Sequence, residues 1–250
     1  HHRLMERAAG ARHVPYVADP SRGSSRTTLN EAESLAVLQR LGIPVAPHVL
    51  VRTAAEAAEA FARLGGGAVV VKGCTSDTTH KSDLGLVRIG VESPDEAVAA
   101  VGDMFSAMER HGLRNEGALV SQLVRGVHEG MLGGHIDPVF GPVVLIGAGG
   151  VYVEAMPDAR VLIPPFSISD AQEAIGQLRI AAVLRGARGK PPVDVGAWAE
   201  AAVRLGDALV GGDLQIDSLD VNPLMLLELG GDAQPAVQAV DGVVILSGRG

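Results

Sequence analysis

The sequence is poor in cysteine and has no long hydrophobic run. Its 250 residues include one cysteine, Cys74, so a framework of internal disulfides is excluded and a reducing cytoplasm is the expected compartment. No apolar run approaches the roughly 18 residues that a membrane-spanning helix needs. The chain shows no secretory signal and begins with His1-His2 rather than Met, so we expect the numbering to begin inside a longer protein.

Aromatic residues and positive charge are also scarce. Aromatic residues make up 3% of the chain and the formal net charge is -8, which argues against a surface for nucleic acids. The hydrophobic content of 47% and the mean hydropathy of +0.23 fit a soluble α/β protein with an aliphatic core. An acidic chain can still bind an anionic nucleotide, but only through local cations, backbone amides or a metal.

Lysine is the rarest of the charged residues, and its placement is informative. Of the 21 basic residues only Lys72, Lys81 and Lys190 are lysines. Lys72 ends the apolar run 68–71, and a polar loop with His80 and Lys81 follows before the next apolar run. A lysine ammonium is a compact point charge. The segment therefore predicts a phosphate-handling hairpin, with a solvated surface loop as the alternative.

The order of the expected elements predicts a mixed α+β fold with hairpins, without strict alternation of strands and helices. We expect 1–27 to form an irregular arm and Thr28 with Glu31 to form a capping box that opens a helix ending near Gly42. Further helices are expected after Thr53, after Ser93, and over 169–184 and 194–210. A short strand is expected within 43–51, after Pro44 and Pro47. Further strands are expected at 68–72, 85–91, 117–124, 129–137, 141–147, 151–154, 160–163 and 214–221, the last ended by Asn222-Pro223, with two more in 236–246.

Three motifs in the second half of the chain carry candidate ligands. The apolar run from Gly141 ends in the glycine cluster 147–150, which favours either a tight turn or a backbone cradle for an anion. Asp220 and Asn222 lie at an expected strand end, and Asp241 lies on a later segment. These oxygens suit Mg²⁺. The alternative for Asp220 and Asn222 is an Asx-Pro turn.

Three further polar groups have two interpretations each. Glu129 lies in a glycine-rich hairpin and is either a surface residue or a site residue. The cations of 185–190 either stabilise a helix C-terminus or form an anion clamp. His80 is either an inert loop residue or a nucleophile that accepts a phosphoryl group. The other histidines lack the spacing of a zinc site.

Taken together, these motifs resemble the ATP-grasp subunit of ADP-forming acyl-CoA synthetases, the acetate–CoA ligases, and more distantly the β subunit of succinyl-CoA synthetase. The resemblance covers about residues 28–248. It rests on the order of motifs that are weak one by one: 29–33 with 41–44, Val71-Lys72, His80-Lys81-Ser82-Asp83, 137–142, Gly149-Gly150, 185–189, 220–224 and Asp241.

The resemblance implies an ATP-grasp fold with MgATP or MgADP between two lobes, expected at 28–116 and 117–250. It implies that Lys72 contacts phosphates and that His80 is a phosphohistidine on a carrier loop. The implied nucleotide contacts are Lys72, Ser121, Gln122, Val124, Glu129 and Arg188. The implied Mg²⁺ ligands are Asn222, Asp241 and Asp220.

The resemblance also implies that a CoA-binding part lies outside this chain, which would supply only the nucleotide-binding part of an acid–thiol ligase. Oligomerisation with copies of itself or with another chain is left open. Where the family usually has Gly-Gly-Val after the loop, this chain has Gly85-Leu86-Val87, and we expect Leu86 to restrict the approach of backbone to phosphate. The rival hypothesis is a regulatory or degenerate ATP-grasp module fused to another domain, such as a protein acetyltransferase. A carboxylate–amine ligase is a weaker option, because the motif around His80 argues against it.

Overall fold

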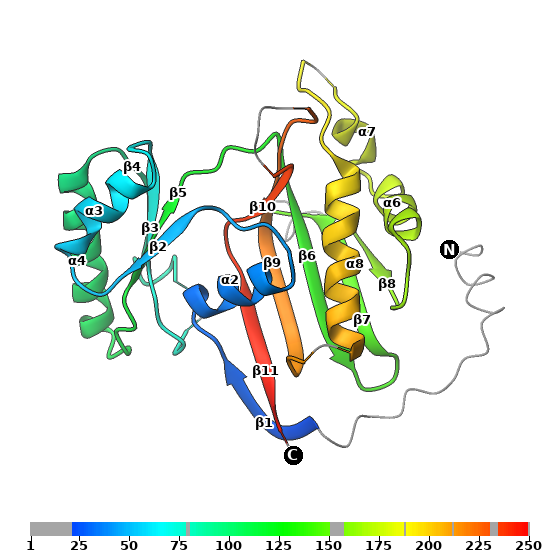
Figure 1. Ribbon diagram of the computed structural model, residues 1–250, viewed down its shortest axis with the longest axis horizontal. Coiled ribbons are helices and arrows are strands. Elements are labelled where there is room, and N and C mark those ends of the chain that lie inside the picture. Colours follow the sequence, from blue (N-terminus) through cyan, green and yellow to red (C-terminus); the bar gives the residue numbers. More distant parts are fainter. Residues whose placement is uncertain are drawn as a thin grey trace.

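The chain folds into two lobes, each built on its own β-sheet (Figure 1). The computed structural model describes residues 22–78, 81–150, 158–187, 189–211, 213–230 and 235–249. In Figure 1 the smaller lobe lies at the left and the larger lobe at the right. This arrangement confirms the expected mixture of helices and strands in two lobes.

The large lobe contains a seven-stranded sheet whose strand order is β1-β11-β9-β6-β7-β8, with β10 pairing β9 beyond the end of β11. Figure 1 shows α2 and α8 in front of this sheet, and their apolar side chains share one core with it. The elements are β1 (Arg22–Thr28), α2 (Glu31–Arg40), β6 (His128–Asp137), β7 (Gly141–Ala148), β8 (Ala159–Leu162), α6 (Ile168–Gly176), α7 (Ala181–Leu184), α8 (Val195–Gly211), β9 (Ile216–Leu226), β10 (Val237–Ala239) and β11 (Val243–Arg249).

The small lobe contains a four-stranded sheet of order β2-β5-β3-β4, covered by two helices. A second core of mainly aliphatic side chains, separate from that of the large lobe, fills the space between the sheet and the helices. The elements are β2 (His48–Val51), α3 (Glu56–Arg63), β3 (Val69–Gly73), β4 (Val87–Val91), α4 (Pro94–Arg110) and β5 (Ala118–Gln122).

The small lobe is inserted into the large one, which differs from the expected division at 116/117. β1 and α2 belong to the large lobe, because β1 pairs with β11 and α2 packs on it. β5 belongs to the small lobe, because it pairs with both β2 and β3. The chain therefore crosses between lobes twice, once before β2 and once after β5. Strand partners far apart in sequence decide lobe membership, and local composition does not show them.

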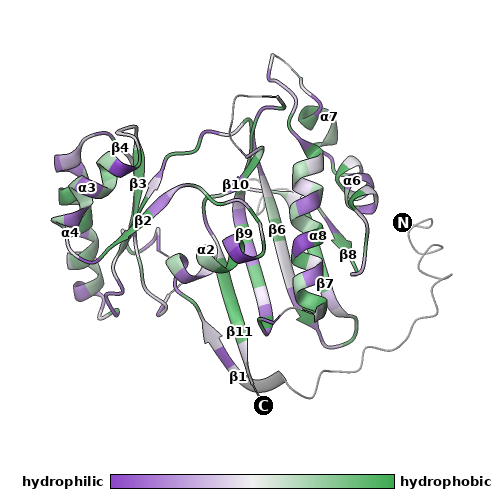
Figure 2. Ribbon diagram, viewed as in Figure 1, coloured by the Kyte–Doolittle hydropathy of each residue, from purple (hydrophilic) through white to green (hydrophobic). Residues whose placement is uncertain are grey.

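Two helix starts follow from capping residues, one of them displaced from its expected place. Ser93 caps α4, with Pro94 at the first helical position, as expected. The box at the start of α2 is formed by Asn30 and Glu33, not by Thr28 and Glu31. The expectation was wrong because Thr28 ends the edge strand β1, whose residues are polar and whose hydrogen bonds go to β11. In Figure 2, β1 carries hydrophilic colour beside the hydrophobic β11.

β9 continues through Asn222-Pro223, where we expected it to end. The register against β6 shifts here, because Asn222 and Pro223 together face one residue, Met131. This is a β-bulge, and a bulge tolerates a proline because it interrupts the ladder of hydrogen bonds. The same bulge faces the break between β10 and β11, so residues from both segments meet at one place.

Other differences concern element ends. The expected helix over 169–184 is two helices, α6 and α7, and the expected strand at 151–154 lies outside the described residues. None of the described helices is both long enough and apolar enough to cross a lipid bilayer.

Candidate active site

The ammonium group of Lys72 lies between the lobes, within reach of two carboxylates. Lys72 is the fourth residue of β3, and only 9% of its side chain is exposed. Its Nζ donates to Oε1 of Glu31 at 2.8 Å and to the carbonyl oxygen of Val240 at 2.8 Å, and lies 3.3 Å from Oδ2 of Asp241. Burial opposes the charge of Lys72, but attraction by Glu31 and Asp241 outweighs it and raises the pKa. Lys72 therefore stays positively charged.

Glu31 is the functional candidate that sequence reasoning missed. It lies in the first turn of α2, and its carboxylate is fully buried. One oxygen accepts from Lys72 and the other accepts from Lys81 at 2.5 Å. Burial alone would raise the pKa of Glu31, but the two ammonium groups together bring it below its ordinary value. The only sequence signal was an acid at a helix start, which also fits a cap.

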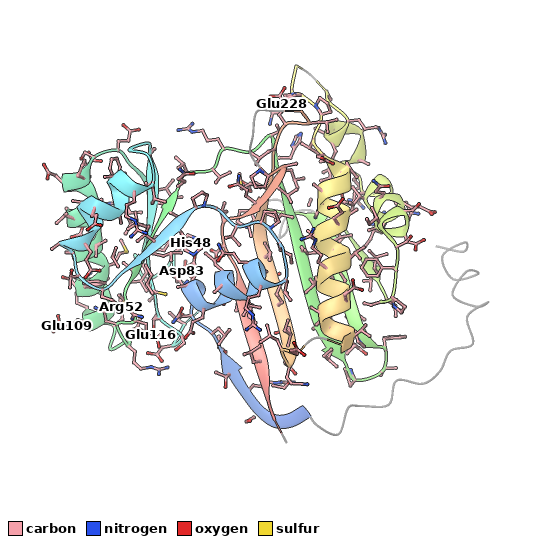
Figure 3. All side chains as sticks on the ribbon, in the orientation of Figure 1. His48, Arg52, Asp83, Glu109, Glu116 and Glu228 are labelled. Atoms are coloured by element: carbon pink, nitrogen blue, oxygen red, sulfur yellow. The ribbon has the colours of Figure 1, made fainter. Side chains whose placement is uncertain are left out.

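The loop between β3 and β4 reaches across to the large lobe at Lys81. The side chain of Lys81 is 11% exposed because it enters the gap beside Glu31. A cavity of about 60 Å³ lies there, lined by Thr75, Lys81, Asp241 and neighbouring residues. Figure 3 labels Asp83, which lies on this loop at the side of the small lobe that faces α2. The loop is therefore in contact with both lobes.

The expectation that Leu86 restricts phosphate approach is wrong. Its side chain is 0% exposed and belongs to the core of the small lobe. A Cβ at Gly73 would lie 3.2 Å from Cδ2 of Leu86, so the leucine side chain fills the space next to that glycine. The side chain points into the core and away from the gap between the lobes.

The first residues of the same loop are attached to the small lobe. Oδ2 of Asp77 accepts from the backbone N–H of Arg114 at 2.7 Å, and Oδ1 accepts from its Nε at 2.9 Å. Ser76 Oγ accepts from Arg114 at 2.9 Å and donates to Glu116 at 3.1 Å. Figure 3 labels Glu116 beside Arg52, whose guanidinium donates to its carbonyl oxygen. The loop thus begins from a fixed base.

Two aspartates and an asparagine meet at the bulge of β9. Asp220 pairs with Val243 across the sheet, which brings it near Asp241. The carboxylate lies over Gly133, the partner of Asp220 in β6, where a Cβ would be 3.5 Å from Oδ1. Desolvation and the charge of Asp241 raise the pKa of Asp220, although the residue is exposed to solvent. Burial and the negative charge of Glu31 raise the pKa of Asp241, and they outweigh Lys72 and Lys81, which lower it.

This acidic group suits a cation, because two carboxylates that each disfavour ionisation are relieved by positive charge. Among the described residues no three His, Cys, Asp or Glu side chains cluster as a metal site. Mg²⁺ does not require such a cluster, since it usually takes one or two protein carboxylates together with substrate phosphates. Asn222 is the third candidate ligand. Its Oδ1 accepts a hydrogen bond from the backbone N–H of Gly150 at 3.0 Å.

The glycine cluster and Glu129 lie at the end of β7. Gly149 donates to the carbonyl oxygen of Glu129 at 2.9 Å. A Cβ at Gly150 would overlap the Glu129 carboxylate, and Gly150 has a φ of 68°, which side chains rarely adopt. The cluster thus brings backbone close to Glu129 and Asn222, as a glycine turn permits.

The expected nucleotide hinge lies where the chain leaves β5. Ser121 is buried, and Nε2 of Gln122 donates to the carbonyl oxygen of Leu64 at 2.8 Å. The backbone N–H groups of Gln122 and Leu123 donate to Pro47 and Ala68. Val124, half-buried, lies in the crossing between the lobes. Two of the N–H groups of the hinge are therefore engaged within the small lobe.

Two expected site residues, His80 and Arg188, lie outside the described residues. The structure does bring together Lys72, Asp220, Asn222 and Asp241, which come from both lobes and from segments far apart in sequence. A larger open groove of about 520 Å³, lined by Arg40, Arg204, Asp213 and others, shares no residue with this site. The charged group between the lobes is the candidate active site.

Comparisons with known proteins agree with this arrangement. Residues 21–246 match the model of a family described as "ATP-grasp domain". The chain belongs to the ATP-grasp family. Among relatives of this ATP-grasp chain, the "Acetate--CoA ligase [ADP-forming] I subunit beta" of Pyrococcus furiosus is 30% identical over 237 residues, which cover 94% of the chain and 98% of the relative. The "Acetate--CoA ligase [ADP-forming] I" of Archaeoglobus fulgidus is 35% identical over 201 residues, covering 80% of the chain and 29% of the relative.

Solved structures of one further protein match most of the ATP-grasp chain. The "dinucleotide forming Acetyl-coenzyme A synthetase 1" of Ca. Korarchaeum cryptofilum, in complex with coenzyme A, Ca-AMPCP and HgCl+, superimposes with a TM-score of 0.80 at 30% identity, covering 98% of each chain. A complex of the same protein with coenzyme A and Mg-AMPPCP gives a TM-score of 0.72 at 31% identity, covering 88% and 93%, and is described with its "phosphohistidine segment pointing towards nucleotide binding site". The chain spans about 30% of the length of its longer curated relatives.

Proposed function

We propose that this chain is the nucleotide-binding part of an ADP-forming acyl-CoA synthetase, which interconverts acyl-CoA, ADP and phosphate with a carboxylic acid, CoA and ATP. One observation carries the proposal. Lys72, Lys81 and the group of Asp220, Asn222 and Asp241 converge between the lobes, and Lys81 directly follows His80 in sequence. One relative that the chain covers almost completely is named as a subunit of an acetate–CoA ligase. A solved structure that the chain also covers almost completely is described as an acetyl-coenzyme A synthetase.

The step assigned to this chain is phosphoryl transfer between ATP and His80. A ring nitrogen of His80 uses its lone pair to form a bond to the γ-phosphorus. The bond from that phosphorus to the bridging oxygen breaks, and ADP leaves with the electron pair. The products are ADP and phosphohistidine, and the reverse step makes ATP. Lys72 places a positive charge beside the transferring group, so positioning and charge neutralisation supply most of the catalysis.

The acidic group would hold Mg²⁺ through Asp241, Asp220 and Asn222. When bound, Mg²⁺ neutralises the charge of the nucleotide phosphates. Asp241, which lies 3.3 Å from the ammonium of Lys72, would be the ligand next to the lysine, and Glu31 holds the lysine in place. Glu129 and the hinge residues Ser121, Gln122 and Val124 are the proposed contacts for ribose and base, with Arg188 as a further contact. Because the side chain and backbone N–H of Gln122 are engaged elsewhere, we expect the base to meet the hinge nearer Val124.

A CoA-binding part outside these 250 residues would supply the acyl chemistry and pass phosphate to and from His80. The relative from Pyrococcus furiosus is named as a β subunit, which supports a partner of this kind. A regulatory module without nucleotide chemistry is disfavoured, because the lysine, both aspartates and the asparagine are all in place.

Isotope exchange tests this function. Labelled ADP mixed with unlabelled ATP, Mg²⁺ and the protein should become labelled ATP, since transfer to His80 is reversible. His80→Ala should abolish the exchange, whereas the matched variant His111→Ala, at the end of α4 in the small lobe, should keep it. Absence of exchange in the unaltered protein, or its persistence in His80→Ala, would contradict the proposal.

A further inference from the structure

The ion pairs of Glu31 link three separate segments of the chain. Glu31 comes from α2 of the large lobe, Lys72 from β3 of the small lobe, and Lys81 from the loop after β3. The exposed fractions of the three side chains are 0%, 9% and 11%. Surface ion pairs form and break at little cost, but removing one partner of a buried pair leaves an uncompensated charge. The position of the loop is therefore coupled to the burial of Glu31.

The two ends of the loop lie on the small lobe, and Lys81 contacts α2 through Glu31. Asp77 and Arg114 fix the beginning, and the backbone N–H of Gly73 donates to the carbonyl oxygen of Leu86 at the end. The backbone N–H of Leu86 in turn donates to the carbonyl oxygen of Lys81 at 2.9 Å. A displacement of Lys81 must therefore do two things at once: it disturbs the turn 81–86, and it breaks the ion pair between Lys81 and Glu31.

We propose that Glu31 is a positioning residue for phosphoryl transfer, because one buried carboxylate orients Lys72 and docks the turn 81–86 against the large lobe through Lys81. The inference rests on the function proposed above. The role assigned to Glu31 is indirect. It acts through the two lysines, and release of Lys81 from Glu31 frees the turn to leave the nucleotide side.

Hydrogen exchange of the ligand-free protein tests the docking without any catalytic assay. Glu31→Gln keeps the size of the side chain and removes its charge. We expect the amides of Leu84, Gly85 and Leu86 to exchange faster by about tenfold or more, because docking no longer protects the turn. Glu33→Gln is the matched control. It removes a charge from the same helical turn, and Gln is accepted in a capping box, so exchange of the turn should stay unchanged.

Lys81→Met provides a second variant that leaves the pair between Glu31 and Lys72 in place, so it remains informative if Glu31→Gln fails to fold. It should also speed exchange of the turn, and Lys81→Arg should restore protection. If Glu31→Gln folds, combining it with Lys81→Met should add little to either single change, because both break one contact. Unchanged exchange in Lys81→Met, or additive effects, would overturn the docking role.

Steady-state isotope exchange between ADP and ATP separates this inference from the proposed function. Lys81→Met should lower kcat by about tenfold while KM for nucleotide changes by less than about threefold, since the nucleotide site itself is intact. If the unaltered protein shows no exchange, the proposed function fails and the hydrogen-exchange result stands alone. If the unaltered protein is active and Lys81→Met matches it in kcat, the positioning role is wrong.

Discussion

At the scale of single residues, the charge of Lys72 contributes to the fold as well as to the site. Its ammonium neutralises Glu31, which is fully buried, and lies 3.3 Å from Asp241. Lys72→Met should lower the free energy of unfolding by about 3 kcal/mol or more, because it leaves a buried carboxylate with one partner fewer. Lys190→Met is the control and should change stability by less than about 1 kcal/mol, since Lys190 is an exposed donor to Val127. Urea unfolding measures the loss of stability in both variants. Equal losses would contradict a role of Lys72 in stabilising the fold.

Leu86 provides a second test at this scale. Its side chain lies in the core of the small lobe, so Leu86→Ala should cost about 2–5 kcal/mol of stability. The affinity of the folded protein for MgADP, measured by calorimetry, should stay the same. A gain of affinity on truncation would show that the side chain obstructs the phosphate site after all.

The sequence singled out Lys72, Asp220, Asn222 and Asp241 as candidate site residues, but it did not single out Glu31. A lysine ending an apolar strand and an acid beside an Asn-Pro pair are local patterns. Glu31 reads locally as a helix-start residue, and its partners are 41 and 50 positions away. Likewise, the sequence alone does not show whether the leucine after Gly85 faces the core or the site, because that depends on Gly73 in the neighbouring strand.

At the scale of elements, the junction of β6 and β7 depends on the absence of a side chain at Gly149. A Cβ there would lie 2.2 Å from the carbonyl oxygen of Gly130, which is backbone and cannot move aside cheaply. Gly149→Ala should therefore destabilise the protein by about 1–3 kcal/mol. Gly102→Ala in the middle of α4 meets nothing within 4 Å and should stabilise by about 0.5–1 kcal/mol. Thermal unfolding compares them, and a neutral Gly149→Ala would contradict the close approach.

The base of the loop should depend on pH in a defined direction. Hydrogen bonds from the side chain and backbone of Arg114 lower the pKa of Asp77 below its ordinary value. The stability that this contact contributes is present above the unfolded pKa of about 3.9 and is lost as pH falls through the lower folded pKa. The stability difference between the unaltered protein and Arg114→Gln should thus be constant at neutral pH and shrink in acid. A difference that grows as the pH falls would contradict the assignment.

Element types followed from sequence better than element ends did. Ser93-Pro94 predicted the start of α4, because a cap and a proline act within one turn. The end expected for β9 at Asn222-Pro223 was wrong, since a proline blocks a regular ladder but not a bulge, and only the register with β6 reveals the bulge. The segment 1–27 was expected to be irregular because of its prolines, Gly23 and a cluster of Ser and Arg, whereas its last residues form β1, whose pairing with β11 is made by backbone groups.

At the scale of the whole molecule, the two lobes meet through buried ion pairs and through an apolar contact. Glu31, Lys72, Lys81 and Asp241 join the lobes by charge, and Leu119 of β5 in the small lobe belongs to the apolar core of the large lobe. A family resemblance could predict the two lobes, but not that the small lobe is inserted between α2 and β6. Strand pairing at long range decides that insertion.

The central claim is that this chain takes the phosphoryl group of ATP onto His80, and one measurement tests it most directly. The protein is incubated with Mg²⁺ and ATP labelled in the γ-phosphate, and the label is mapped by peptide mass spectrometry under alkaline conditions that preserve phosphohistidine. The account predicts label on the peptide that contains His80 and its return to added ADP as ATP. Label on another residue, or no label on a protein that binds MgADP, would contradict it.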